Sequence, residues 1–389
     1  MTITLATLNA QHIAVDSYEI PGLYRGICGY VGNPSKSQMQ RVVVKLPVQL
    51  AVLGAGLIGK RHIEHINKEP EAELYAVVDP APAGREIASA WGVKWYPNFA
   101  AMISSGKPDG VIIATPNQMH VTNGLEAIAA NVPALIEKPL ADDLVGGVRL
   151  VEAAEKAGVP ILTGHHRRHN PMIQRAKAII DEGRLGQIVT VHGFFWLMKP
   201  DDYFDLRWRQ EIGAGPVLLN LIHDIDLLRY LCGEVEAVQA FQSNAVRNYP
   251  VDETTVVIVK FASGALGTMN ITDTVVAPWS WEHTTGENPD YPHTDQICYQ
   301  IGGTHGSLSV PRLELWTNEA KRGWWEPFRI ERHVAADEDP LRLQIRQFCR
   351  VIKGEEKPLV SGYEGLMTLK VMDAVKLAAN SGELVRIER

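Results

Sequence analysis

The stretch Gln49-Leu50-Ala51-Val52-Leu53-Gly54-Ala55-Gly56-Leu57-Ile58-Gly59 decides the fold of the first half of the chain. Its apolar start predicts a buried strand, and its glycines follow the G-x-G-x-x-G pattern of a dinucleotide-binding turn. These glycines allow a tight turn, close approach of the backbone to a pyrophosphate, and tight packing of the next helix on the strand. The free N–H groups of that helix would face the phosphates. We therefore expect cofactor contacts from Gly54, Gly56, Leu57, Ile58 and Gly59.

An acidic residue supports this interpretation and selects the cofactor. Asp79 follows the next apolar strand, 20 residues after Gly59. A carboxylate in this position accepts hydrogen bonds from the adenosine ribose and repels a 2′-phosphate. The residues Pro80-Ala81-Pro82-Ala83 supply no cation that would offset this repulsion. NAD is therefore favoured over NADP, with the alternative that Asp79 only caps the following turn.

Strand-like and helix-like segments alternate after this turn. Short apolar runs at 72–78, 110–114, 134–136 and 159–163 are separated by helical patterns. Alternation at this spacing predicts an α/β fold with a doubly wound parallel sheet, which is a Rossmann domain. We place that domain at residues 47–167.

The second half of the chain has a different residue pattern, with successive strand-like segments in place of alternating strands and helices. Segments rich in β-branched and aromatic residues follow one another at 188–195, 237–241, 255–261 and 265–272. This pattern predicts an α+β domain with a large, mostly antiparallel open sheet, which we place at residues 168–389. Residues 1–46 precede the dinucleotide strand and form an N-terminal extension, either an added strand and loop or a mobile arm.

Composition excludes several classes of protein. The 389 residues are 46% hydrophobic and 21% charged, with a net charge of −7. Nucleic acid is not expected as a partner because phosphate binding needs a concentrated basic surface. No run approaches the roughly 18 apolar residues of a membrane span, and the start does not resemble a signal peptide. Four widely spaced cysteines are typical of buried thiols, so we expect a cytoplasmic protein.

Three further motifs identify a family. Ala114-Thr115-Pro116-Asn117-Gln118-Met119-His120 follows the third strand, Glu137-Lys138-Pro139 follows the fourth, and His223-Asp224-Ile225-Asp226 lies on a helix of the second half. Together with the glycine turn, they resemble the glucose–fructose oxidoreductase / inositol dehydrogenase / rhizopine-catabolism (Gfo/Idh/MocA) family. The resemblance covers about residues 47 to 389. It implies cofactor contacts from Thr115, Pro116, Asn117, His120, Glu137 and Lys138, and from the Trp208-Arg209 pair.

The resemblance also implies two catalytic residues. Lys138 would contact both the substrate hydroxyl and the nicotinamide ribose, and an ammonium there can stabilise a developing oxyanion. His223 is the candidate general base, because a neutral imidazole titrates near the operating pH. Many members carry an aspartate four residues before this histidine, but this chain has Leu219. Asn220 lies on the same helical face and is expected to bind substrate instead.

The junction between the halves carries a basic cluster. Gly164-His165-His166-Arg167-Arg168-His169-Asn170-Pro171 resembles a family element that lines the active site. We expect His166 and Arg168 to reach substrate or cofactor. A metal site is the alternative interpretation, but no partner at metal-ligand spacing supports it, and we expect no metal. A long segment at 278–293 and the tryptophans Trp196, Trp279 and Trp281 are further candidates for the site.

These observations lead to one functional hypothesis and two alternatives. The leading hypothesis is an NAD-dependent dehydrogenase that oxidises a secondary hydroxyl of a sugar, polyol or related cyclic alcohol. The alternatives are an NAD-dependent glycosidase that uses transient oxidation, and a catalytically inactive NAD-binding sensor. The family resemblance further implies a homo-oligomer, a dimer or tetramer.

Overall fold

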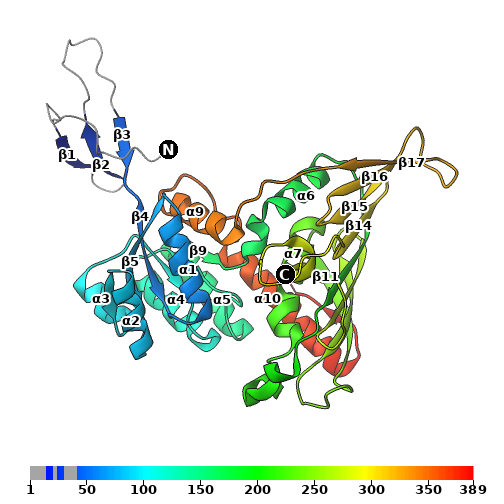
Figure 1. Cartoon of the computed structure of the whole chain (residues 1–389), viewed down its shortest axis with the longest axis horizontal. Coiled ribbons are helices and arrows are strands. Elements are labelled where there is room, and N and C mark those ends of the chain that lie inside the picture. Colours follow the sequence, from blue (N-terminus) through cyan, green and yellow to red (C-terminus); the bar gives the residue numbers. More distant parts are fainter. Residues whose placement is uncertain (1–14, 21–23, 30–41, 389) are drawn as a thin grey trace, which may run out of the picture.

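The computed structural model describes residues 15–20, 24–29 and 42–388, and contains three β-sheets in that part of the chain (Figure 1). The first belongs to the N-terminal extension, where β2 (Tyr24–Gly29) pairs antiparallel with β1 (Val15–Ile20) and β3 (Val42–Lys45). Other parts of the extension, residues 1–14, 21–23 and 30–41, lie outside the described residues. The described strands make a sheet of their own rather than joining either larger sheet.

The second sheet is the Rossmann sheet that the sequence predicted. Its six parallel strands follow the order β6-β5-β4-β7-β8-β9. The chain adds β5 and β6 on one side of β4 and then crosses over to add β7, β8 and β9 on the other side, so the strand order reverses next to β4. Ligands of such folds bind at the carboxyl ends of the strands beside this reversal. The strands are β4 (Val48–Leu53), β5 (Ala72–Val78), β6 (Lys94–Tyr96), β7 (Gly110–Ile113), β8 (Ala134–Ile136) and β9 (Ile161–Thr163).

Helices connect these strands, and their starts follow the expected capping chemistry. Asn98 and Asp143 accept hydrogen bonds from backbone N–H groups in the first turns of α3 and α5, which satisfies donors that the helix itself cannot pair. The helices are α1 (Leu57–Lys68), α2 (Pro82–Ala90), α3 (Phe99–Ser105), α4 (His120–Ala129) and α5 (Leu144–Ala157).

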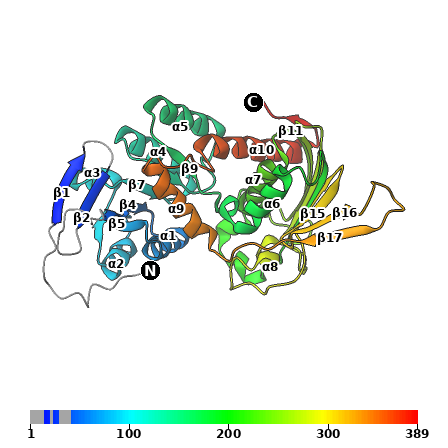
Figure 2. The same cartoon turned by 90° about the horizontal axis from the view of Figure 1, so that it is seen from above.

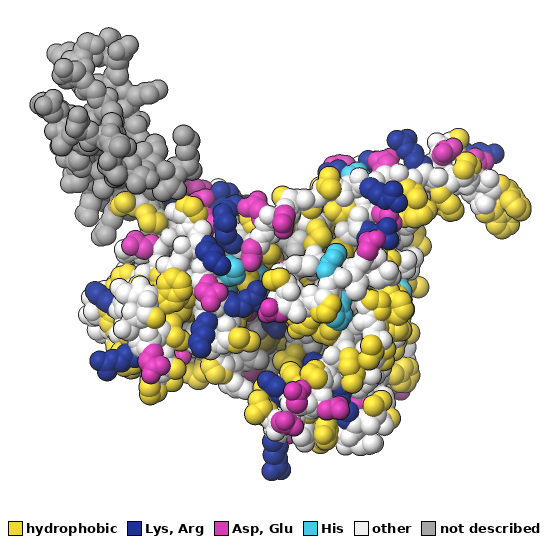
Figure 3. Space-filling model, in the orientation of Figure 1, with side chains coloured by type: hydrophobic (Ala, Val, Ile, Leu, Met, Phe, Trp, Pro, Cys, Tyr) yellow, Lys and Arg dark blue, Asp and Glu magenta, His cyan; other side chains and the backbone are white. Residues whose placement is uncertain are grey.

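A helix from near the end of the chain completes the Rossmann half. α9 (Pro340–Ile352) places Ile345 and Phe348 in the same buried cluster as Leu50 and Val52 of β4 (Figure 2). Ion pairs fix its position, including Arg342 and Arg346 with Glu69, and Figure 3 shows basic and acidic side chains side by side between the two halves. The domain limits 47–167 and 168–389 stay our proposal, with α9 as a helix of the second segment docked on the first.

The third sheet is large and mostly antiparallel, as predicted. Its nine strands follow the order β17-β16-β15-β14-β10-β13-β12-β11-β18, and the β10–β13 pair is parallel. The strands are β10 (Ile188–Trp196), β11 (Val235–Ser243), β12 (Thr254–Phe261), β13 (Leu266–Thr272), β14 (Tyr299–Gly303), β15 (Gly306–Val310), β16 (Glu314–Asn318), β17 (Phe328–Arg332) and β18 (Val385–Arg386).

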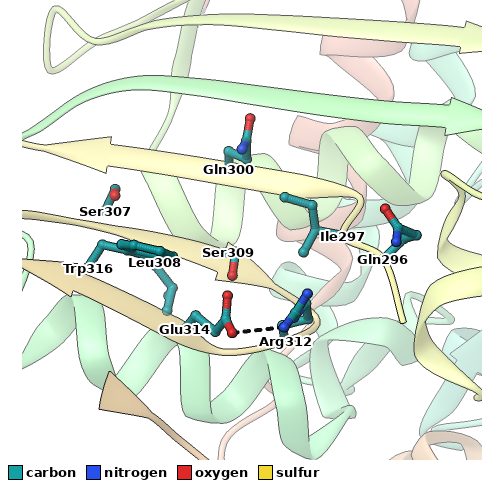
Figure 4. Close-up of a pocket in the computed structure, with 9 residues that line it drawn as sticks. All are labelled: Gln296, Ile297, Gln300, Ser307, Leu308, Ser309, Arg312, Glu314 and Trp316. Atoms are coloured by element: carbon teal, nitrogen blue, oxygen red, sulfur yellow. Dashed lines mark hydrogen bonds and ion pairs between the residues drawn. The ribbon is translucent and has the colours of Figure 1, made fainter. Parts of the chain in front are cut away.

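Helices cover one face of this sheet and leave the other exposed. The core between them takes residues from α6 (Pro171–Asp181), α7 (Ile222–Cys232) and α10 (Gly362–Ser381). On β12, Val257 and Val259 face this core while Val256 and Ile258 are exposed on the opposite face. The uncovered face holds a pocket of about 390 Å³, lined by Gln300, Ser307, Ser309 and Trp316 among others (Figure 4).

Candidate active site

The glycine turn has the close contacts that its pattern predicts. Gly54 has a φ of +89°, and a Cβ there would lie 2.5 Å from the Ala114 carbonyl oxygen. At Gly59 a Cβ would lie 2.0 Å from the Gly54 oxygen. A Cβ at Gly56 would meet nothing within 4 Å, so this glycine borders open space at the start of α1. Leu57 and Ile58 open the helix, and their N–H groups are free to bind a phosphate.

Asp79 holds the glycine turn in place. Its Oδ2 accepts from the Ala55 N–H at 2.7 Å, and its Oδ1 accepts from the Ala81 N–H at 2.8 Å. The contact with Ala81 is the cap of the following turn that we considered as the alternative role. Asp79 therefore caps the turn after β5 and supports the glycine turn at the same time. Because each carboxylate oxygen can accept more than one hydrogen bond, both keep capacity for ribose hydroxyls.

The segment after β7 is tied to the segment after β8. The buried ring of His120 contacts the Thr115 carbonyl oxygen through Nε2 at 2.9 Å and the Pro139 carbonyl oxygen through Nδ1 at 2.7 Å. Pro116 and Asn117 are exposed beside these strand ends. His120 therefore positions the two loops, while the exposed residues are free to contact a cofactor.

The Glu137-Lys138 pair turns its two side chains in different directions. Glu137 is buried and its Oε1 lies 2.6 Å from Nε2 of His62 on α1. Burial alone would raise the pKa of Glu137, but this hydrogen bond and the charge of His62 lower it to about 2. The Glu137 carboxylate thus supports α1 from inside the fold, and a cofactor contact from Glu137 stays a prediction.

Lys138 reaches across to the second half of the molecule. Its Nζ donates to the backbone oxygen of Leu219 at 3.2 Å, which ties the end of β8 to the segment before α7. Burial, more than any neighbouring charge, lowers the pKa of Lys138. The position that lacks the family aspartate thus contacts Lys138 through its main chain.

The segment before α7 is wound as a π turn, η6 (Val217–Leu221), which continues directly into α7. Asp252 caps it by accepting from the Val217 N–H at 3.0 Å. π turns inside helices are frequent at functional sites. This turn holds Asn220, whose Oδ1 is buried without a hydrogen-bond partner in the described part of the chain.

His223 lies one turn further, at the start of α7. Its ring is edge-on to His166, with 5.5 Å between the ring centroids, and to His165 at 6.2 Å. Burial, followed by the charges of Lys138 and Arg167, holds the pKa of His223 well below its usual value. The imidazole is therefore neutral, which is the form that a general base needs, but its pKa lies below the operating pH near which we expected it to titrate.

The structure adds acidic partners that sequence reasoning missed. Glu287 lies 3.1 Å from Nε2 of His166, and Glu282 accepts from Arg167 at 3.0 Å. Both come from α8 (Trp281–Thr285) or directly after it, within the long segment that we noted only for its tryptophans. Trp281 is buried beneath the Arg167 guanidinium, so it is a packing residue rather than a substrate platform.

Arg168 does not face His223. Its guanidinium forms two hydrogen bonds of 2.8 Å to Asp226 and an ion pair of 3.0 Å with Glu364 on α10. The buried carboxylate of Asp226 thus holds this guanidinium, and a contact of Arg168 with substrate or cofactor stays a prediction. The neighbouring Arg167 lies closer to the site, and its Nε and Nη1 are buried without a hydrogen-bond partner in the described chain.

Two residues expected near the nicotinamide lie on a short 3₁₀ turn, η5 (Arg207–Gln210). Trp208 is 55% exposed, and Arg209 stacks on Tyr203 while donating to its backbone oxygen at 2.8 Å. Tyr203 thus fixes Arg209, and Trp208 is left accessible for a ligand.

Two further observations concern metals and membranes. Within the described residues, no group of three or more His, Cys, Asp or Glu side chains is arranged to hold a metal ion. No helix of that part of the chain is long and apolar enough to cross a bilayer.

The Rossmann half carries a glycine turn and Asp79 at the end of a strand, and Lys138 and His223 lie at the domain junction. These features together define a nicotinamide-dependent oxidoreductase. Two family models match this chain. The oxidoreductase family with an NAD-binding Rossmann fold matches residues 48–165, and the GFO/IDH/MocA C-terminal domain matches residues 173–309. The chain belongs to the Gfo/Idh/MocA family and is an NAD-binding oxidoreductase, which confirms the expected family, enzyme class and cofactor.

Individual relatives cover between three quarters and nine tenths of this chain. The myo-inositol 2-dehydrogenase of Thermotoga maritima is 26% identical over 88% of this chain and 99% of its own. The 2,7-anhydro-N-acetylneuraminate hydratase of Escherichia coli is 29% identical over 75% of each chain. The WlbA dehydrogenase of Bordetella pertussis, solved with NADH and UDP-GlcNAcA, superimposes with a TM-score of 0.71 at 26% identity, covering 88% of this chain and 99% of its own.

Proposed function

We propose that this protein is an NAD-dependent dehydrogenase that oxidises a secondary hydroxyl of a sugar, polyol or related cyclic alcohol. The observation that carries the proposal is the contact of Lys138 with the Leu219 carbonyl, because it places an ammonium group beside His223. Two similar proteins support the substrate class: one is named a myo-inositol 2-dehydrogenase, and the other is a dehydrogenase solved with the sugar nucleotide UDP-GlcNAcA.

The residues present fit NAD. The open space at Gly56 and the free N–H groups of α1 suit a pyrophosphate, and Asp79 suits ribose hydroxyls. Bound NAD supplies an acceptor for the hydride of the alcohol carbon. Thr115, Pro116, Asn117 and Trp208 are proposed to line its nicotinamide half.

The chain's own residues are proposed to handle the oxygen and the proton. Lys138 donates a hydrogen bond to the substrate oxygen and stabilises the negative charge that develops when the proton leaves. Burial lowers the pKa of Lys138 because it disfavours the ammonium, and the charges of Glu137 and Glu282 offset part of this cost. Neutral His223 accepts the hydroxyl proton, and Asn220, with its unpartnered Oδ1, accepts from a second hydroxyl of the substrate.

A specific relative favours one alternative. A hydratase changes its substrate without net oxidation, and one relative of this chain bears that name. An enzyme that oxidises transiently and then returns the hydride, as the glycosidase alternative does, would also show no net redox change. The two functions differ in one product, because only a dehydrogenase accumulates NADH.

The experiment is a panel of inositols, sugars, anhydrosugars and sugar nucleotides incubated with NAD. Net NADH formation with at least one member is the expected result. Consumption of a panel member without NADH would replace the dehydrogenase by the transient-oxidation enzyme.

A further inference from the structure

Within the part of the chain that the structure describes, no carboxylate forms a hydrogen bond or ion pair with His223. The charges with the largest effect on its pKa are those of Lys138, Arg167, His166 and His165, and all of them lower it. Its Nδ1 is buried without a hydrogen-bond partner in the same residues. These charges disfavour a proton on the ring, so the ring must pass the proton on before the next turnover.

His166 has the carboxylate that His223 lacks. Its Nε2 lies 3.1 Å from Oε1 of Glu287, and Asn170 donates to the other oxygen of Glu287 at 2.9 Å. Asn170 is itself fixed, because its Oδ1 caps α6. The side chains of His166 and Glu287 are 17% and 13% exposed, so the pair is built into the fold rather than formed on the surface.

The charge of Glu287 decides the tautomer of His166. Burial by itself would raise the pKa of Glu287, but the hydrogen bond and charge of His166, together with Arg167, lower it to about 2. An ionised carboxylate only accepts hydrogen bonds, so Nε2 of His166 is the donor. In the neutral ring Nδ1 is then the acceptor nitrogen, and this ring is the one that contacts His223 edge-on.

We propose that His166 and Glu287 are the proton-accepting pair of this active site, an inference that rests on the dehydrogenase function proposed above. The substrate O–H bond breaks and its proton joins His223, while the electron pair of the C–H bond leaves as hydride to NAD. No direct hydrogen bond joins the two rings in the described part of the chain, so His223 then passes a ring proton through one bridging water molecule to Nδ1 of His166. His166 becomes an imidazolium beside the Glu287 carboxylate. Glu287 acts as a positioning residue throughout.

A pocket beside Glu287 can connect the pair to solvent. A pocket of about 460 Å³ opens beside the pair and has Asn170 and Glu287 in its wall. Solvent in this pocket can take the proton from the pair after each turnover. The titratable and charged groups that face His166 are Glu287 after α8, His223 on α7, His169 on the same 3₁₀ turn, and Glu137 at the end of β8.

The first test needs no substrate. Nitrogen-15 NMR of the histidine rings in the NAD-bound protein reports which nitrogen carries the proton. Neutral His166 is expected as the Nε2–H tautomer in the wild type, and Glu287→Ala is expected to lose this preference. A wild-type His166 in the Nδ1–H tautomer would overturn the proposal.

The second test uses the alcohol that gives NADH in the panel. His166→Phe and Glu287→Gln are expected to lower kcat roughly 10- to 100-fold with little change in KM, since His223 then loses the group that takes its proton. Added imidazole is expected to restore part of the kcat of His166→Ala. Asp337→Asn, in the wall of the same pocket, is the control and is expected to keep the wild-type pH profile.

The outcomes separate the two proposals. If both His166→Phe and Glu287→Gln keep the wild-type kcat and pH profile while NADH still forms, the proton-accepting pair is wrong and the dehydrogenase function stands. If the wild type forms no NADH with any panel member, the dehydrogenase function fails, and the tautomer measurement still decides the pair.

Discussion

The main chain of Leu219 makes a contact that its side chain cannot make. Where many relatives are expected to place an aspartate, this chain presents a carbonyl oxygen to Lys138, within a π turn. A carbonyl can orient the ammonium group but cannot take up a proton. The proton has to go elsewhere, and this requirement motivates the pair of His166 and Glu287.

Replacing Lys138 tests its proposed role directly. Lys138→Ala is expected to lower kcat by about 10²- to 10³-fold, because a donor to the developing oxyanion is lost. NAD affinity, measured by calorimetry, is expected to change little. The exposed Lys156→Ala is a matched control that should leave both quantities unchanged. Normal turnover of Lys138→Ala would remove this residue from the mechanism.

Asp79 is predicted to set the cofactor preference. Asp79→Ala is expected to weaken NAD binding by about 10-fold, the effect of losing roughly 1.4 kcal/mol of hydrogen bonding to the ribose. Its contacts to Ala55 and Ala81 are lost as well, so a thermal melt must show that the variant is folded. Titration of NAD and NADP checks the prediction, and an unchanged ratio of the two affinities would contradict it.

The 3₁₀ turn η3 (His166–His169) is the element that concentrates the basic residues. Burial lowers the pKa of His169 to about 3 and that of the preceding His165 to about 4. Unfolded histidines bind a proton near pH 6.5, whereas these two stay neutral in the folded protein. Their contribution to stability is therefore complete above pH 6.5 and falls as the pH drops toward 4.

His169→Asn is expected to reduce this acid sensitivity. Between about pH 6 and 4.5, the slope of unfolding free energy against pH should fall by at most about 1.4 kcal/mol per pH unit, the value for one proton. Urea unfolding at a series of pH values measures the slope. Equal slopes in variant and wild type would show that His169 is not the source.

Local patterns predicted some elements well and others not at all. Runs such as Val48–Leu53 and alternating segments such as Thr254–Phe261 have unambiguous periodicity, and the structure confirms them as β4 and β12. The strands β14 to β17 carry polar and aromatic residues on an exposed face, which weakens the alternation. The π turn before α7 is beyond such patterns, because periodicity does not distinguish a π turn from an α-helix over five residues.

At the scale of the whole molecule, the site depends on contacts that no local pattern contains. Glu287 lies 121 positions from His166, and Glu137 lies 75 positions from His62. Lys138 and His223 were predicted as catalytic residues because their motifs resemble those of a known family. The contacts of Glu137 with His62 and of Arg168 with Asp226 join residues that only the fold brings close.

The uncovered face of the nine-stranded sheet is where we propose a homo-oligomer to form. Phe241, Ile258 and Leu266 are 64%, 47% and 55% exposed on neighbouring strands. Apolar groups in such numbers are typical of association surfaces. Light scattering should give a dimer or tetramer, and Ile258→Asp should shift it toward the monomer, whereas the exposed Val145→Asp on α5 should not. A monomeric wild type at micromolar concentration would contradict the proposal.

The central claim is net oxidation of an alcohol by NAD at the junction of the two halves. The most direct measurement follows NADH and substrate together while the wild-type protein reacts with the panel. We predict one NADH for each molecule of alcohol consumed, formed about 10²- to 10³-fold more slowly by Lys138→Ala. Substrate loss without NADH, or NADH formation at the wild-type rate by Lys138→Ala, would contradict the account.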